Sequence, residues 1–241
     1  MKPTLAIAAA LALAVGLAGC GTTAGGTAPV DQTAASGGRV YEAATLETLL
    51  KETEKTLGTG TIEGDAALHK TVADTAANSP IDAITAAGAV ISPTTCSAAL
   101  AKSTKVSSTL FTNNRGFVGA ELKYKRGAVI LMTVKGKPLP SSIYATAKSR
   151  SEASVAACTP MSLTIGGQTV PVKITKLTAP TDADQTTGYL EEITIPGTTL
   201  TVVAIEATYG NLLITAESVG STAEAVAAID AVVAAARADA I

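Results

Sequence analysis

Hydrophobic residues first recur at helical spacing shortly after residue 40. Leu46, Leu49, Leu50 and Leu57 fall on one face of a helix, and glycines follow directly as stop signals. Residues 61–91 have the weakest pattern, with a weak helix expected over 65–78 and a short one from Ser79-Pro80. A second Ser-Pro pair at 92–93 predicts a further helix that runs through Cys96.

The period changes at residue 117, where hydrophobic and polar residues begin to alternate. Residues 117–125 read as a strand, and 128–134 are apolar apart from Thr133, as in a central strand buried on both faces. A helix is expected over 139–157. Five further strands are predicted at 161–165, 168–177, 188–195, 199–208 and 211–219. The last element, 221–238, has an apolar stripe and a capping box of Ser221 and Glu224.

This order of elements predicts an α+β fold. Gly166-Gly167 and Pro196-Gly197 join consecutive strands as hairpins, so the sheet should be antiparallel. We expect a twisted sheet of about six to seven strands, with helices packed on one face and one disulfide. Residues 41–241 should form a single domain, since that length suits one core.

The N-terminus predicts export and lipid attachment. Lys2 precedes an uncharged run over 5–17, which as a helix is only ~20 Å long and too short for a bilayer core of ~30 Å. Leu17-Ala18-Gly19-Cys20 matches a bacterial lipobox, so 1–19 are expected to be a lipoprotein signal peptide and Cys20 the lipid anchor. The alternative is an ordinary signal peptide cut after an alanine. The Gly, Thr and Ala-rich stretch over 20–40 then reads as a flexible tether.

Two cysteines remain once Cys20 is lipidated. An even pair in an oxidising compartment is most simply a disulfide, here between Cys96 and Cys158. The alternative is two buried free thiols.

The sequence offers few residues suited to catalysis or cofactor binding. We therefore expect no enzyme, cofactor or metal site. His69 is the single histidine, with no nucleophile motif near it. Asp65 lies four residues before it, but two ligands make a weak metal site, and a plain exposed helix explains them better. The formal net charge is −2 and aromatic residues make up 3% of the chain, which disfavours nucleic-acid binding.

Basic residues gather around the first predicted hairpin. They are Arg115, Lys123, Lys125, Arg126, Lys135 and Lys137. The first four are the candidate site for an anionic ligand or envelope polymer. The competing interpretation is an edge strand that lysines protect against aggregation.

These features together resemble the PknH-like extracellular sensor-domain lipoproteins of actinobacteria. The resemblance covers roughly 85–238 and rests on the lipobox, the tether, a helical cysteine at 96, the strand pair 117–134, a helix ending in Cys158, and strands closed by 221–238. It implies a ligand cleft between sheet and helices. The family domain usually has two disulfides, whereas this chain can form one.

The expected function is therefore that of a cell-envelope lipoprotein. It would be held at the extracytoplasmic face of the cell membrane through Cys20, with a non-catalytic domain that binds a small ligand or an envelope protein. The alternative is a lipid or glycolipid carrier, because residues 49–52 before a β-rich block are loosely similar to actinobacterial lipid-carrier lipoproteins. A carrier would need a large apolar cavity.

Overall fold

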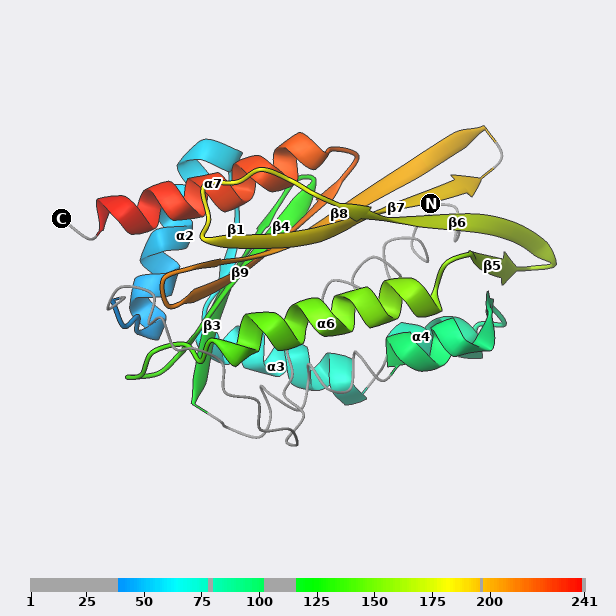
Figure 1. Ribbon diagram of the computed structural model, residues 1–241, viewed down its shortest axis with the longest axis horizontal. Coiled ribbons are helices and arrows are strands. Elements are labelled where there is room, and N and C mark those ends of the chain that lie inside the picture. The colour runs from blue at the N-terminus through cyan, green and yellow to red at the C-terminus, as the bar shows by residue number, and fades with distance from the viewer. Residues whose placement is uncertain (1–38, 78–79, 102–115, 196, 240–241) are drawn as a thin grey trace.

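The computed structural model describes residues 39–77, 80–101, 116–195 and 197–239. These residues form one open, fully antiparallel sheet of nine strands in the order β1-β3-β4-β9-β8-β7-β6-β5-β2, together with helices (Figure 1). The fold class is thus α+β, as the order of helical and strand patterns predicts.

Helices and strands alternate along the chain in blocks. The helices are α2 (Ala43–Leu57), α3 (Asp65–Ala77), α4 (Pro80–Ala86), α6 (Ser142–Ala157) and α7 (Thr222–Ala238), and residues 94–101 are also helical. The strands are β1 (Gly60–Glu63), β2 (Val90–Ser92), β3 (Phe117–Tyr124), β4 (Gly127–Val134), β5 (Met161–Ile165), β6 (Gln168–Leu177), β7 (Gln185–Ile195), β8 (Thr198–Tyr209) and β9 (Leu212–Val219).

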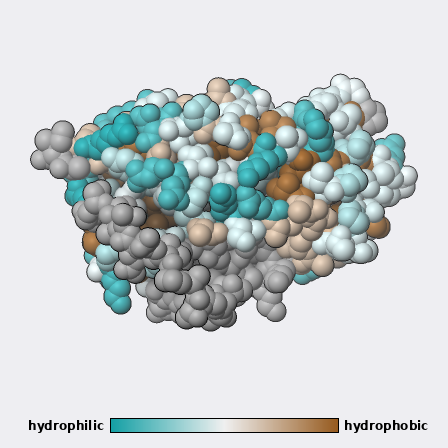
Figure 2. All heavy atoms as spheres, viewed as in Figure 1, coloured by the Kyte–Doolittle hydropathy of each residue, from teal (hydrophilic) through white to brown (hydrophobic). Residues whose placement is uncertain are grey.

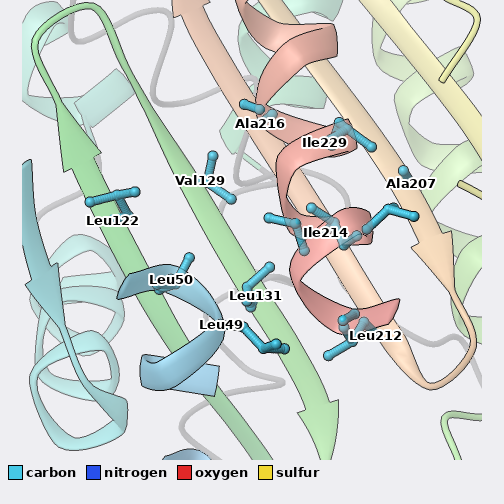
Figure 3. Close-up of a cluster of buried hydrophobic side chains, with 14 of the residues drawn as sticks. Leu49, Leu50, Leu122, Val129, Leu131, Ala207, Leu212, Ile214, Ala216 and Ile229 are labelled. Carbon is cyan, nitrogen blue, oxygen red and sulfur yellow. The ribbon is translucent and has the colours of Figure 1, made fainter. Parts of the chain in front are cut away.

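One face of the sheet packs against α2 and α7 and forms the main core. Leu49 and Leu50 of α2 and Ile229 of α7 are buried against Leu131 and Ile214 of the central strands (Figure 3). The leucines of α2 recur every three to four residues, so they form one stripe that faces the sheet. We call this side of the sheet the α2–α7 face; its strand residues are apolar and closely packed.

The opposite side of the sheet, which we call the α6 face, packs against the remaining helices. It carries two separate apolar clusters. One lies around Cys96, Cys158, Ile174 and Ile193, and the other joins Leu68 of α3 and Ile143 of α6 to strand residues. In Figure 1 the sheet runs between α7 above and α6, α3 and α4 below.

Helices therefore cover both faces, and the expectation of helices on one face is wrong. Neighbouring residues on the central strands show the reason. Leu131 and Met132 are both buried, as are Val202 and Val203, although successive strand residues point to opposite faces. Apolar side chains on both faces need cover on both faces, which is what a continuous apolar run indicates.

The sheet is also larger than the six to seven strands expected. The two additional strands, β1 and β2, lie at its opposite edges and have four and three residues. Such short segments are too brief to show an alternating pattern. Their pairing with β3 and β5 is decided by the rest of the sheet.

A disulfide joins Cys96 to Cys158, with 4.5 Å between their Cα atoms. Cys96 lies in the helical segment 94–101, and Cys158 follows the last residue of α6. Both sulfurs are buried in the first cluster of the α6 face. The bond therefore ties two helical segments together over the same face of the sheet, as the sequence predicts.

Candidate functional site

Four glutamates share the α6 face of the central strands. We call them the carboxylate row: Glu121 of β3, Glu217 of β9, Glu206 of β8 and Glu191 of β7. The strand register places them on one side, because Glu206 pairs with Thr215, two residues from Glu217, and Glu191 pairs with Val202, four residues from Glu206. Residues separated by an even number of positions along a strand point to the same face. Thr215 also pairs with Ile130, the partner of Glu121.

Glu191 is the most deeply buried member of the row. Its exposed fraction is 1%, and neither carboxylate oxygen has a hydrogen-bond partner among the described residues. It stands between Ile174 on β6 and Val202 on β8, which are both buried and apolar. Burial raises the pKa of Glu191 to about 7, because the charged carboxylate loses its hydration there.

Glu217 and Glu121 are shifted in the same direction. Burial, followed by the negative charges of Glu121, Glu191 and Glu206, raises the pKa of Glu217 to about 8. Burial also raises the pKa of Glu121, although the nearby Lys123 ammonium acts against it. Glu191 and Glu217 thus ionise close to neutral pH rather than in the usual acidic range.

Tyr189 lies on β7, two residues from Glu191, on the same face as the row. It pairs with Ala204 across β7 and β8, and Ala204 pairs with Glu217 on β9, so a small side chain separates the phenol from that glutamate. Burial and the charges of Glu206, Glu217 and Glu191 raise the pKa of the Tyr189 phenol well above its ordinary value. Three carboxylates therefore surround one buried aromatic ring.

Helix α6 lies over this region and is held at its two ends. Ile143 packs into the second cluster of the α6 face, and Val155 packs against the first. Between them Tyr144 is half-buried. Burial is the larger cause of the raised pKa of its phenol, and the negative charge of Glu206 adds to it. The helix thus brings a second tyrosine to the row.

Ion pairs lie at two sides of the row. Lys123 contacts Glu63 at 2.7 Å and Glu121 at 3.4 Å, and Lys176 of β6 contacts Glu152 of α6 at 2.6 Å. Figure 2 shows brown, hydrophobic surface between the strands and α6 on the right half of the view, with teal side chains beside it. The row therefore has charged groups at its rim, and Glu191 within it stands between two apolar neighbours.

The described residues contain no group of three or more His, Cys, Asp or Glu side chains placed to hold a metal ion. Asp65 and His69 lie on one face of α3, as their spacing indicates, with 3.3 Å between Oδ1 and Nε2. Asp65 also accepts a hydrogen bond from the Gly119 amide, at 2.8 Å. This aspartate therefore joins α3 to β3.

The basic residues predicted as a ligand site do not converge. Lys123 turns to the α6 face and pairs with acids there, whereas Arg126 reaches Glu224 at the start of α7, at 3.1 Å, on the other side of the sheet. Lys125 is exposed in the turn between β3 and β4. Arg115 lies outside the described residues, as do Cys20, the signal peptide and most of the tether. An anionic ligand at this hairpin stays a prediction.

Sequence reasoning did not identify the carboxylate row. It did not bring Glu191 together with the glutamates on the other strands. The available signal was a single acid inside an apolar strand, as in Ala120-Glu121-Leu122 and Ile205-Glu206-Ala207. An acid at such a position is costly to bury and therefore unusual in a core.

Comparison with solved structures finds a similarity to the extracellular domain of a kinase. The extracellular domain of PknH from Mycobacterium tuberculosis superimposes with a TM-score of 0.47 at 11% sequence identity, over 84% of this chain and 100% of that one. A TM-score below 0.5 at this identity does not establish a shared ligand or function. No protein-family model matches the sequence, and no curated protein sequence matches it significantly.

Proposed function

We propose that the protein is a membrane-anchored cell-envelope lipoprotein whose domain binds a ligand or partner, without catalysis, at the carboxylate row beneath α6. The domain would stand at the extracytoplasmic face of the membrane, tied to it by lipid on Cys20. Its two sheet faces then have separate roles. The α2–α7 face stabilises the fold, and the α6 face binds the ligand or partner.

The observation that carries the binding proposal is the state of Glu191. A buried carboxyl without a hydrogen-bond partner costs free energy, and an apolar residue of similar volume in its place would stabilise the fold. Such groups concentrate at functional sites, where the cost is offset by what they bind. Glu121 and Glu206, on two further strands of the same face, are also buried, and Glu121 contacts Lys123.

The anchor is supported by the N-terminal sequence. A short apolar run and the lipobox Leu17-Ala18-Gly19-Cys20 make Cys20 the acceptor of the lipid. Among the described residues no helix is both long and apolar enough to cross a bilayer. Intact mass of the protein from its own envelope should show a chain that begins at Cys20 and carries acyl groups. A Cys20→Ala variant is the control and should carry none.

Native mass spectrometry tests the binding site. Protein purified gently from its own envelope should carry an additional non-covalent mass that denaturation releases. Tyr144→Ala removes the tyrosine that α6 contributes, and it should abolish this mass. The matched control is Tyr209→Ala, because Tyr209 is also half-buried but packs against the core of the α2–α7 face.

Three results would count against this proposal. A chain that carries no additional mass under any condition contradicts binding, and equal loss from both tyrosine variants contradicts the location beneath α6. A released mass that proves to be an acyl lipid would support the carrier function instead. In that case the apolar clusters, rather than the glutamates, would be the contact surface.

A further inference from the structure

The arrangement of the carboxylate row indicates what kind of ligand it takes. We infer that the row binds an organic ammonium compound, with Glu191, Glu206 and Glu217 as counter-charges around the ring of Tyr189. This inference rests on the proposed function, and it adds the chemical class of the ligand to it. It follows from how the carboxylates, the aromatic rings and the apolar surfaces are placed relative to one another.

The charges in the region are the first argument. Three glutamates act electrostatically on the Tyr189 phenol, and no positive charge contributes to its shift. Two cations at the rim are already engaged, since Lys123 pairs with Glu63 and Glu121, and Lys176 pairs with Glu152. A positive ligand would relieve the mutual repulsion of the row and give Glu191 a partner, which it lacks among the described residues.

The spacing of the carboxylates is the second argument. Glu206 and Glu217 are diagonal neighbours on adjacent strands, and such positions lie about 7–8 Å apart. The glutamates thus surround the ring instead of meeting at one point. Calcium needs about six to eight oxygens at roughly 2.3–2.6 Å from the ion, whereas separate ammonium groups can each bind a separate carboxylate.

The aromatic and apolar surroundings are the third argument. Tyr189 comes from the sheet and Tyr144 from α6, and the negative charge of Glu206 contributes to the raised pKa of both phenols. Aromatic faces attract organic cations, particularly where water is excluded. The clusters around Ile174 and around Ile143 flank this region, and they would accept the methylene groups between charged nitrogens.

Isothermal titration calorimetry with spermidine, a linear triamine, tests the inference on the purified mature protein at pH 8. Spermidine should bind, and Glu217→Gln should weaken it by about tenfold or more, as loss of one counter-charge implies. Glu192→Gln is the matched control and should leave affinity unchanged. Glu192 is next to Glu191 in sequence but pairs with Lys173 on the other face. Affinity should fall at pH 5.5, where Glu191 and Glu217 are protonated.

Tyr189 provides a second test that separates the ring from its hydroxyl. Tyr189→Phe should keep spermidine affinity within about twofold, and Tyr189→Leu should lower it by about tenfold, because only leucine removes the aromatic face. Thermal melts check that each variant is folded. Glu191→Gln serves as an additional variant, since a neutral amide replaces a costly buried charge without changing its shape.

The result that overturns the inference is spermidine binding that is absent, or unaffected by Glu217→Gln and Tyr189→Leu. Calcium binding at the same residues in place of spermidine overturns it as well. If the native protein still releases a non-cationic molecule that depends on Tyr144, the proposed function stands and only the ligand class is wrong. If it releases nothing, both fail.

Discussion

Glu191 and Glu192 are adjacent in sequence and lie in opposite environments. Glu191 is buried on the α6 face without a hydrogen-bond partner among the described residues, whereas Glu192 pairs with Lys173 at 3.0 Å on the other side of the strand. The alternation of side chains along β7 creates this difference. The pair therefore offers two nearly identical substitutions, of which one changes the candidate site and the other does not.

The stability of the protein should fall as the pH rises from about 4.5 to 7. The unfolded chain ionises Glu191 near its ordinary pKa of 4.5, but the folded chain holds the proton until about 7. Between these values the folded state binds more protons than the unfolded state. The stabilisation that this proton contributes is therefore complete below pH 4.5 and is gone above pH 7. The loss amounts to about 3 kcal/mol for this group.

Glu191→Gln should remove this loss, and urea unfolding at a series of pH values measures it. The difference in unfolding free energy between variant and parent should grow in favour of the variant up to pH 8. Glu192→Gln should show no such trend. A Glu191→Gln variant that followed the parent at every pH would mean that Glu191 is solvated.

Removal of the disulfide should lower stability strongly. The bond closes a segment with a sequence separation of 62, for which the chain-entropy relation gives about 4 kcal/mol. Cys96→Ser combined with Cys158→Ser should therefore melt well below the parent in oxidising buffer. In dithiothreitol the two proteins should melt together. Equal melting temperatures under oxidising conditions would show that the bond does not form.

The two faces of the sheet should differ in their sensitivity to truncation. Leu131 is 0% exposed in the α2–α7 core, whereas Ile130 is half-buried on the α6 face. Leu131→Ala should cost about 3–5 kcal/mol in urea unfolding, because it leaves a cavity in close packing. Ile130→Ala should cost clearly less. Equal costs would contradict the assignment of the main core to the α2–α7 face.

Regular elements with a strong local pattern were predictable from the sequence. The leucine stripe of α2 and the Ser221 cap of α7 lie where their residues indicate, and the Ser221 hydroxyl accepts a hydrogen bond from the Glu224 amide at 3.3 Å. The Glu224 carboxylate instead contacts Arg126 and Ser218. Local signals fix where a helix begins, but the partners of a long side chain depend on the tertiary fold.

The sequence also indicates that both faces of the sheet are covered. The run over 128–134 indicates a strand buried on both sides, which requires helices on both sides. The carboxylate row is different in kind. Its members come from β3, β9, β8 and β7, and their adjacency depends on strand order, which alternation within one strand does not reveal.

The central claim is that the glutamates of the α6 face lie together in a region shielded from water. Carbon-13 NMR titration of the glutamate carboxyl groups tests it most directly, with resonances assigned through Glu191→Gln and Glu217→Gln. The predicted result is that Glu191 titrates at about 7 and Glu217 at about 8. Midpoints for both near the ordinary value of 4.5 would contradict the claim.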